Sequence, residues 1–456
     1  MMERFVEIVG AANAIREDAR MQPYMTEWRG TYQGRAALVL SPENVAEVSA
    51  ILKLASETNT KIVTQGGNTG LTGAQIPFEH GREILLSTRR LNRVRNVDAA
   101  SDVMIVEAGV TLAQAQNAAA AENRLFPLSL ASEGSCSIGG NIATNAGGTA
   151  VIAYGNMRDL VLGLEVVLAS GEIWNGIKAL RKDNAGYDLK QMFIGSEGTL
   201  GIITAASLRL FAQPRARVVA LVGLNSPAEA IALYAQAREI AGLSLTALEL
   251  IPRFGLDIMV KHMGKGNPIA KAFPWYVLIE LSGADSFISL AERMLEILPE
   301  NAAIAQSERQ ANELWSLREG LSEAQKFEGA SIKHDVSVPI SSLAEFIRQA
   351  LAELAQKFPR VRPLPFGHLG DGNLHFNISQ PEGENSADFR AKTGEINAIL
   401  HGLTRQFGGS IAAEHGIGRL KRELLEQVKS PVEMEMMRGL KRMLDPQNIL
   451  NPGKVV

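Results

Sequence analysis

The chain has 456 residues, a formal net charge of −3, and 46% hydrophobic and 21% charged residues, which excludes general disorder and any broad basic field for nucleic acid or an anionic membrane. Its one cysteine, Cys136, excludes intrachain disulfides and cysteine-built metal or iron–sulfur sites. The first residues lack the apolar core of a signal peptide, and no run reaches the roughly 20 apolar residues of a membrane span, so we expect a cytoplasmic protein, soluble or peripheral at a membrane.

The first half of the chain is expected to alternate short strands and helices. Ser41-Pro42-Glu43 predicts a helix start, with the serine as N-cap and the proline at the first helical position. A second helix is expected after Thr111. The apolar runs that predict strands lie at residues 61–64, 84–87, 102–108 and 161–174 (two strands), and the segment GTLGIITAASLRL at 198–210 ends this half.

Beyond residue 213 the pattern changes to one typical of an α+β domain with antiparallel strands. A helix is expected from Ser226 and another near 284–298. Capping boxes are expected at Ser226–Glu229 and at Ser342–Glu345. The strands of this half are expected at residues 218–224, 244–250 and 275–281.

Glycines gather in two loops. Four lie in TQGGNTGLTG (residues 64–73) and five in GSCSIGGNIATNAGG (residues 134–148). Glycine lets backbone approach a ligand closely, and successive N–H groups can bind an anion such as pyrophosphate. Between Arg124 and Arg158 the only charged residue is Glu133, so amides and Ser, Thr or Asn side chains would hold that anion.

The alternative is that these are glycine-rich turns at domain edges. A third cluster, GSEGTLG at residues 195–201, favours a ligand site instead. The dinucleotide motif G-x-G-x-x-G after a strand and the phosphate-binding loop of NTPases are both missing, which disfavours a Rossmann NAD site and a P-loop.

The segments TQGGNTGLTGAQIP, PLSLASEGSCSIGGNIATNAGG and IGSEGTLGIIT resemble the FAD-binding domain of the vanillyl-alcohol oxidase / p-cresol methylhydroxylase (PCMH) superfamily. Some relatives attach the flavin covalently through a histidine after the paired glycines, and this chain has Asn68 there, which implies non-covalent FAD. The terminal LNPGK resembles the family's flavin-side ending. The resemblance implies cofactor contacts from Gly66, Gly67, Asn68, Thr69, Gly70, Ser132, Gly134, Ser135, Gly139, Asn141, Ala143, Thr144, Gly198, Ile202 and Asn451.

Five of the seven histidines lie between residues 334 and 415. In PFGHLGDGNLHFNIS a Gly-Asp-Gly-Asn turn brings His368 beside His375. Further on, GSIAAEHGIGR carries Glu414 and His415. Two imidazoles and a carboxylate suit zinc or another divalent transition metal. The alternative is a hydrogen-bonded polar hairpin.

GHLGDGNLHFN and AAEHGIG resemble the C-terminal domain of FAD-linked D-2-hydroxyacid dehydrogenases, which include D-lactate and D-2-hydroxyglutarate dehydrogenases. The resemblance runs from about residue 35 to the final ILNPGK. It implies that His368, His375 and Glu414 bind a divalent metal, zinc or alternatively manganese. It also implies that His415 is the catalytic base and that Asn377 lies beside the substrate.

Arg318, in the expected helix ELWSLREGLSEAQ, would by pattern alone be read as part of a solvated helix face. Ser322 is four residues on and shares its face, and Lys333 lies on the expected strand SIKHDVSV. The resemblance implies that all three bind the substrate carboxylate. Threonine is common in the family at the position of Ser322, so substrate size is expected to shift with this change.

Other residues receive no catalytic role. His334 alternates onto the apolar face of its strand, so we expect it to be structural. Cys136 has no nearby base in the sequence and is expected to be a packing residue. His80, His262 and His401 show no partner pattern.

The fold implied is α+β, with a PCMH-type FAD-binding domain at residues 1–213 and a substrate (cap) domain with an antiparallel sheet at 214–425. A C-terminal helical segment, 426–456, returns to the flavin domain. The implied reaction is oxidation of a D-2-hydroxy acid to the 2-oxo acid, with hydride transfer to the flavin N5 and metal-assisted deprotonation of the hydroxyl. D-2-hydroxyglutarate or a similar diacid is favoured over D-lactate.

Other activities of the superfamily remain as alternatives: an oxidase that reacts with O₂, an ether-lipid transferase with a non-redox flavin, or a glycolate-oxidase-type FAD subunit of a larger complex. The electron acceptor is expected to be an electron-transfer flavoprotein, a quinone or a cytochrome. The family also implies a homodimer, and no nucleic-acid partner is expected.

Overall fold

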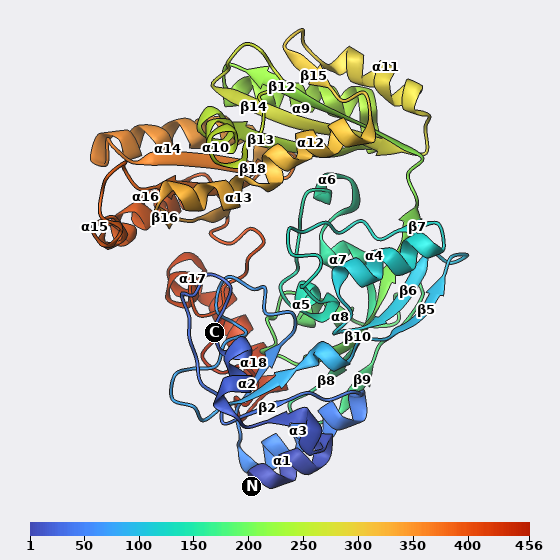
Figure 1. Ribbon diagram of the computed structural model, residues 1–456. Coiled ribbons are helices and arrows are strands. Elements are labelled where there is room, and N and C mark those ends of the chain that lie inside the picture. Colours follow the sequence, from blue (N-terminus) through green and yellow to red (C-terminus); the bar gives the residue numbers. More distant parts are fainter. The chain divides into compact units, whose positions relative to one another are not determined.

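The computed structural model describes residues 1–456, which fold as two compact units (Figure 1). The chain passes from the first unit to the second between Ala212 and Gln213 and returns to the first unit at Glu414. The first unit comprises Met1–Gly147, Gly155–Ala212 and Glu414–Val456, and the second comprises Gly148–Tyr154 and Gln213–Ala413.

The first unit is built on small sheets. A four-stranded sheet has the order β1 (Ala14–Ile15), β2 (Leu38–Leu40), β4 (Ile84–Ser87), β3 (Ile62–Gln65). A five-stranded antiparallel sheet has the order β5 (Val94–Asp98), β6 (Val103–Glu107), β10 (Ile202–Arg209), β8 (Val161–Val167), β9 (Ile173–Asn175). A two-stranded ribbon pairs β7 (Arg124–Leu125) with β11 (Phe211–Ala212). The expected strands of the first half are therefore confirmed.

Helices flank these sheets in Figure 1. α3 packs Val48, Leu52 and Ala55 into an apolar cluster with strand residues such as Leu38. The helices of this unit are α1 (Met2–Val9), α2 (Asp18–Met25), α3 (Val45–Thr58), α4 (Leu112–Ala121), α5 (Ile138–Ala143), α7 (Met157–Leu160), α8 (Lys190–Phe193), α17 (Arg422–Val428) and α18 (Pro431–Leu444).

Two helix starts in this unit test the capping predictions. The helix after Thr111 is confirmed, and Thr111 forms a capping box with Gln114. The predicted start at Ser41-Pro42-Glu43 is wrong, because α3 begins at Val45 with Asn44 as its N-cap. The Asn44 side chain accepts a hydrogen bond from the backbone N–H of Glu47 at 2.9 Å, so asparagine satisfies the donor that serine was expected to take.

The second unit is built on an eight-stranded sheet whose pairs are antiparallel. The path runs β15 (Ala302–Ile304), β12 (Ala216–Leu224), β14 (Trp275–Gly283), β13 (Leu245–Pro252), β18 (Arg362–His368), β19 (Asn373–Ser379), β16 (Ser331–Ile332), and β17 (Asp335–Ser337) also pairs with β19. This confirms the antiparallel α+β prediction.

The sheet of the second unit is covered on both faces. In β12, Val218 and Ala220 belong to one apolar cluster while Val219 and Leu221 belong to another, as the period of two in a strand requires. The first cluster contains residues of α9 (Pro227–Ala241), α11 (Phe287–Ile297), α14 (Leu343–Lys357) and α16 (Thr393–Gln406). The second contains residues of α10 (Arg253–Met263), α12 (Glu308–Glu319) and α13 (Leu321–Ala324). The short helices α6 (Val151–Tyr154) and α15 (Ser386–Ala391) complete the unit.

The two predicted capping boxes of this unit differ in outcome. Ser226 accepts from the backbone N–H of Glu229 at 3.2 Å, so the helix start at Ser226 is confirmed. The reciprocal half of the box is wrong, because the Glu229 carboxylate accepts from the backbone N–H of Asn225 instead. The box at Ser342–Glu345 is wrong, because Ser342 makes no cap hydrogen bond and has a helical backbone conformation. It ends the short 3₁₀ turn that leads directly into α14, and Glu345 pairs with Arg348 instead.

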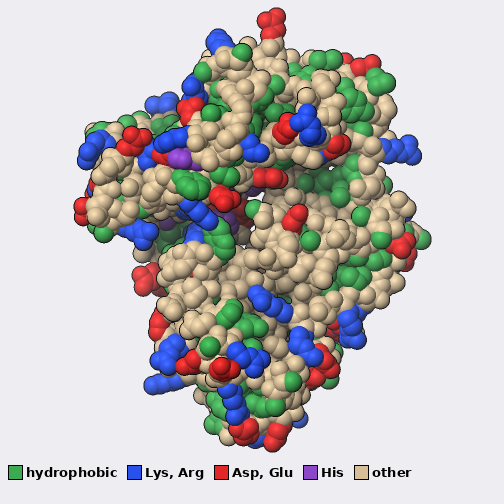
Figure 2. All heavy atoms as spheres, in the orientation of Figure 1, with side chains coloured by type: hydrophobic (Ala, Val, Ile, Leu, Met, Phe, Trp, Pro, Cys, Tyr) green, Lys and Arg blue, Asp and Glu red, His purple; other side chains and the backbone are tan.

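The visible surface carries both signs of charge interspersed, with no continuous field of one sign (Figure 2). This distribution agrees with the small net charge of −3. An acidic ligand therefore has to be recognised by local groups. No helix combines the length and apolar character that crossing a membrane requires.

Candidate active site

Two of the glycine loops pack closely within the first unit. A Cβ on Gly67 would lie 2.0 Å from the carbonyl oxygen of Ser135, and one on Gly66 would lie 2.2 Å from Ser137 Oγ. No larger residue fits at either position without moving backbone or a buried side chain. The structure therefore brings the first loop (residues 64–73) against the second (residues 132–148).

The third loop (residues 195–201) and the C-terminal tail join them. The backbone N–H of Glu197 donates to the carbonyl of Ala143 at 2.8 Å. The buried side chain of Asn451 donates through Nδ2 to the carbonyl of Glu197 at 2.7 Å. A Cβ on Gly198 would contact both Asn451 and Thr64. Loops far apart in sequence thus meet where the resemblance placed a flavin.

Asn68 has a left-handed backbone, with φ 61°, which asparagine tolerates better than most residues. Its Nδ2 donates to the carbonyls of Pro23 and Thr26 at 3.2 and 3.0 Å. The amide is therefore held by backbone. It offers no nucleophile for a covalent flavin link.

Polar atoms at these loops suit FAD. Thr64 Oγ1 and Ser137 Oγ are buried without a hydrogen-bond partner in the protein. Such atoms cost free energy unless a ligand or water pairs them. Free hydroxyls beside close-packed glycines fit a pyrophosphate held by uncharged groups. Ile202, by contrast, lies in the apolar cluster beneath the loops.

The loop after His415 is anchored on the glycine loops by Glu197, which the sequence analysis missed. The two carboxylate oxygens of Glu197 accept from the backbone N–H groups of Ile417 and Gly418 at 2.7 and 2.9 Å. A Cβ on Gly418 would lie 2.3 Å from the carbonyl oxygen of Thr72. Burial raises the pKa of Glu197 to about 7, against the lowering effect of the two amides. The only sequence signal was a glutamate inside GSEGTLG.

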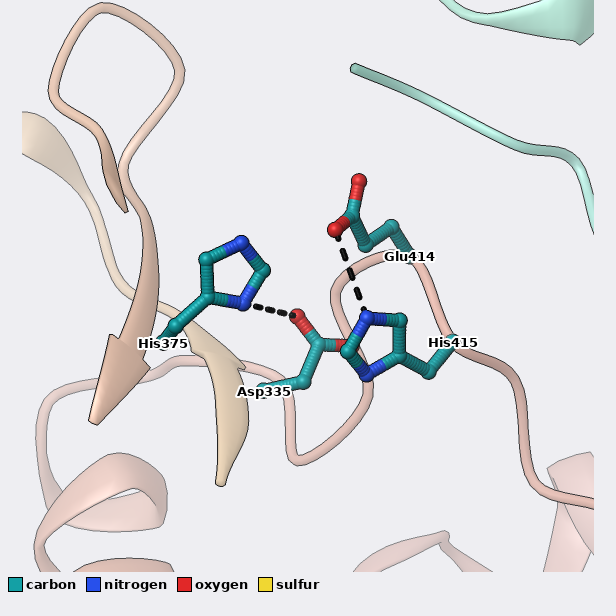
Figure 3. Close-up of side chains that lie close together, drawn as sticks. All are labelled: Asp335, His375, Glu414 and His415. Atoms are coloured by element: carbon teal, nitrogen blue, oxygen red, sulfur yellow. Dashed lines mark ion pairs between the residues drawn. The ribbon is translucent and has the colours of Figure 1, made fainter. Parts of the chain in front are cut away.

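Glu414 and His415 begin this anchored loop. His415 Nε2 lies 3.4 Å from Glu414 Oε1, an ion pair when the imidazole is protonated (Figure 3). Both side chains are half-buried. The imidazole can accept a proton, and the neighbouring carboxylate can accept a hydrogen bond from it.

The second unit places Arg318 in a buried pair. It lies near the end of α12 with 8% of its surface exposed. Its Nε–H donates to Glu249 Oε2 at 2.6 Å, and its guanidinium carbon lies 4.8 Å from the centre of the Phe366 ring. The prediction that Arg318 might be a solvated helix residue is therefore excluded. Its hydrogen bond to Glu249 leaves both Nη groups for a ligand.

The same carboxylate holds His368. His368 Nδ1 lies 2.6 Å from Glu249 Oε1. The two residues lie opposite one another because β13 pairs with β18 in that register. Burial alone would raise the pKa of Glu249, but the charges and hydrogen bonds of His368 and Arg318 bring it below the usual value. An ionised carboxylate only accepts, so Nδ1 carries a proton, and in the neutral imidazole the lone pair is then on Nε2.

His375 lies beside His368, as the turn predicted. Their ring centres are 5.6 Å apart in an edge-to-face arrangement. His375 Nδ1 is 3.9 Å from Asp335 Oδ1 (Figure 3), and Asn373 donates to the same oxygen at 2.9 Å. Asp335 and His375 face one another because β17 pairs with β19 in that register. Asp335 had no predicted role.

Of the remaining predicted substrate residues, Asn377 is buried and donates to Gln325 Oε1 at 2.9 Å. Lys333 is half-buried between β16 and β17. Ser322 is exposed, and the expected continuous helix that joins it to Arg318 is wrong. Gly320 separates α12 from α13.

His334 is buried, with Nδ1 at 3.0 Å from the carbonyl of Phe376 and Nε2 at 2.8 Å from Asn397 Oδ1. This agrees with a structural role. Cys136 is buried too, and burial raises the pKa of its thiol. It therefore lacks the lowered pKa of a nucleophile.

Each unit carries side chains that suit a divalent transition metal. His368, His375 and Asp335 lie in the second unit, and Glu414 and His415 lie in the first. Imidazole nitrogens and carboxylate oxygens are the ligands that zinc and manganese accept. Asp335, His375, Glu414 and His415 are drawn in Figure 3.

Comparison with known proteins assigns both halves of the chain. Residues 36–176 match the FAD binding domain family, and residues 213–455 match the family of FAD linked oxidases, C-terminal domain. The structure resembles p-cresol methylhydroxylase with substrate bound, at a TM-score of 0.76 and 17% identity, covering 99% of this chain and 95% of that one. This likeness supports the PCMH-type fold.

Relatives match over nearly the full chain. The D-2-hydroxyglutarate dehydrogenase of Xanthomonas citri pv. viticola is 38% identical, covering 99% of this chain and 96% of the relative. The mitochondrial enzyme of that name from Danio rerio is 38% identical over 94% of this chain and 80% of its own length. A Schizosaccharomyces pombe protein named as a mitochondrial D-lactate dehydrogenase is 34% identical over 96% and 85%. The chain therefore belongs to the FAD-linked oxidase family, in the branch that contains the FAD-dependent D-2-hydroxyacid dehydrogenases.

Proposed function

We propose that this protein oxidises a D-2-hydroxy acid to the corresponding 2-oxo acid, and that D-2-hydroxyglutarate or a similar diacid is its preferred substrate. The observation that carries the proposal is the contact of buried Glu249 with Arg318 and His368, with His375 beside His368, in the second unit. Relatives named D-2-hydroxyglutarate dehydrogenase, at up to 38% identity, support the choice of substrate.

Arg318 is the proposed site for the substrate carboxylate. Its two Nη groups form a fork that matches the two oxygens of a carboxylate, and the guanidinium stays charged at any working pH. Lys333 is a second cation on a neighbouring strand segment. A diacid would use both cations, whereas a monoacid such as lactate needs only one. D-lactate is the second candidate substrate, favoured by the relative that carries that name.

His368, His375 and Glu414 are the proposed metal ligands, and Asp335 is a further donor. Ser410 pairs with Ser337, two residues beyond Asp335 on the same strand. Glu414 follows Ser410 by four residues, so the chain between them spans at most about 14 Å. The acidic loop is therefore tethered within reach of the imidazoles. A bound divalent cation would supply positive charge that favours the ionised substrate hydroxyl.

His415 is the proposed general base for the substrate hydroxyl. An imidazole has an ordinary pKa near 6.5, so it can take a proton at neutral pH. Glu414 beside it would stabilise the imidazolium that results. FAD, when bound by the glycine loops, supplies the acceptor for the hydride that leaves the α-carbon. The chain's own residues thus bind the acid, orient it and remove one proton.

Anaerobic flavin bleaching with a panel of 2-hydroxy acids, each as both enantiomers, tests the proposal. We expect the D-enantiomer of 2-hydroxyglutarate to reduce the flavin with the highest kcat/KM, and the L-enantiomers to leave it oxidised. If D-lactate is the better substrate, the diacid assignment is wrong. If no 2-hydroxy acid reduces the flavin, the proposed reaction is wrong.

Zinc as the metal, a homodimer, a cytoplasmic location and an external electron acceptor stay predictions of the same proposal. Metal analysis of the purified protein and sedimentation of the holoenzyme check the first two. Steady-state assays with an electron-transfer flavoprotein, a quinone analogue and cytochrome c distinguish the acceptors. Peroxide formed stoichiometrically in air would instead identify an oxidase.

A further inference from the structure

Glu249 occupies an unusual place for a carboxylate. It lies in β13 within the apolar run TALELIP, between Ala247 and Ile251, which both belong to the second apolar cluster. Its relative exposure is 0%. A buried carboxylate is costly unless it is paired and hydrogen-bonded. Its burial therefore requires partners that offset the free-energy cost of taking the charge out of water.

Both partners of Glu249 are residues with proposed roles. Oε2 accepts from Arg318 Nε and Oε1 interacts with His368 Nδ1, each at 2.6 Å. The two contacts use opposite oxygens of one carboxylate. Arg318 is 69 residues away in sequence and His368 is 119 residues away, so the carboxylate links two separate chain segments.

Each of these two contacts fixes the orientation of the side chain that it holds. Holding Nε of Arg318 turns the two Nη groups away from Glu249 and fixes the plane of the guanidinium. Holding Nδ1–H of His368 selects the tautomer whose lone pair is on Nε2, which is what metal ligation requires. The Phe366 ring, 4.8 Å from the Arg318 guanidinium carbon and 5.2 Å from the His375 ring centre, packs in the same group.

We propose that Glu249 is a positioning residue that couples the substrate-carboxylate site at Arg318 to the metal site at His368. This rests on the proposed function for the roles of those two residues. It predicts that one substitution weakens metal binding and substrate binding together. A carboxylate that served only folding would change neither affinity.

The test uses Glu249→Gln in the full-length holoenzyme. Glutamine has the same shape but one acceptor oxygen, so it cannot accept from both Arg318 and His368 and its NH₂ must face one of the two donors. We expect the Kd for Zn²⁺, measured by titration of the metal-free holoenzyme, to rise 10–100-fold. We also expect the KM for D-2-hydroxyglutarate to rise more than kcat falls. Glu249→Asp keeps two acceptors and should restore part of both affinities.

Glu280→Gln is the matched control. Glu280 lies on the adjacent strand β14 and accepts from Trp315 Nε1 and Thr246 Oγ1 at 2.8 and 3.0 Å, so it is a hydrogen-bonded carboxylate of the same sheet outside the proposed site. We expect Zn²⁺ affinity and KM to stay at wild-type values. Thermal midpoints of both variants separate lost stability from lost affinity. His375→Ala identifies the Zn²⁺ that belongs to this site.

The outcomes distinguish the positioning role of Glu249 from the proposed oxidation of a D-2-hydroxy acid. Unchanged Zn²⁺ affinity and KM in a folded Glu249→Gln protein overturn the positioning role. A wild-type protein without His375-dependent Zn²⁺ binding also overturns it, while flavin reduction by a D-2-hydroxy acid would still support the oxidation. Zn²⁺ binding that depends on Glu249, in a protein whose flavin no hydroxy acid reduces, supports the positioning of His368 and overturns the proposed function.

Discussion

Glu197 in the first unit and Glu249 in the second are both buried carboxylates, yet their pKa values shift in opposite directions. Glu197 is held by two backbone amides, and burial raises its pKa to about 7. Burial acts on Glu249 as well, but His368 and Arg318 bring its pKa below the usual value. Burial alone therefore does not decide the charge of a carboxylate, whereas nearby cations do.

The same contrast separates the two proposed ligand sites. The glycine loops of the first unit offer amides and hydroxyls such as Ser137 Oγ and Thr64 Oγ1. The second unit gathers Arg318, Glu249 and histidines. The first arrangement suits a cofactor bound through backbone, and the second suits an acid bound through charge. The two functions should therefore be separable by mutation.

The largest expected effect follows removal of the proposed base. His415→Ala should slow flavin reduction by substrate by 10²–10⁴-fold, the usual contribution of general acid–base catalysis. FAD should stay bound because the glycine loops do not use this side chain. Anaerobic stopped-flow spectroscopy measures the rate of flavin reduction, and the flavin absorbance of the purified variant measures the bound FAD. Wild-type reduction rates in this variant would reject His415 as the base.

Removal of the metal from the wild-type protein should impair the proposed substrate site and leave the flavin site unchanged. Dialysis against a chelator should abolish most of the activity, and added Zn²⁺ or Mn²⁺ should restore it, because the proposed metal stabilises charge on the substrate hydroxyl. The flavin should remain at full occupancy. Full activity in a sample shown by elemental analysis to be metal-free would remove the metal from the mechanism.

The raised pKa of Glu197 predicts a pH-dependent stability. Because its folded pKa of about 7 exceeds the unfolded value, its stabilising contribution is fully present below about pH 4.5 and is lost as pH rises through 7. The loss amounts to at most about 3.5 kcal/mol, since each pKa unit is worth about 1.4 kcal/mol.

Urea unfolding of the wild type and of Glu197→Gln between pH 5 and pH 8 isolates this contribution. The free energy of unfolding of the wild type relative to the variant should fall across that range. A difference that is constant with pH would show that Glu197 stays ionised, and the contrast with Glu249 would then disappear.

The smallest effect compares a glycine of the flavin loops with a glycine outside them. Gly67→Ala places a Cβ 2.0 Å from the carbonyl oxygen of Ser135, and overpacking of this kind costs about 1–3 kcal/mol. FAD occupancy should fall with it. Gly394→Ala in α16 is the control, because a Cβ there has no protein atom within 4 Å and the position lies outside the flavin loops. Equal FAD occupancy in both variants would show that the close contact of the two loops is not needed for the cofactor.

Local patterns allowed much of the fold to be predicted. The GDGN turn and the alternation of Leu374 and Phe376 with His375 and Asn377 fix the hairpin of β18 and β19, because turn preference and side-chain direction depend on neighbouring residues alone. The errors in the predicted helix caps also arise from local preferences. Asn44 was a better cap than Ser41 in its context, and the competing residues lie within one turn of helix.

The partners of the candidate site could not be predicted locally. Glu249 appears in sequence as one acidic residue in an apolar strand, and its meaning depends on residues 69 and 119 positions away. Asp335 gained its place opposite His375 from the register of β17 and β19. Gly320 separates the helix of Arg318 from that of Ser322, and Ser322 is exposed whereas Arg318 is buried.

The sequence by itself determined the chemical types in this protein: glycine loops without cations, an arginine, and paired histidines followed by Glu-His. These are properties of short segments, where residue type and spacing are enough. Only the tertiary structure decided which carboxylate pairs with which cation and what pKa results. Those outcomes depend on burial and on contacts between strands far apart in the chain, which no local pattern encodes.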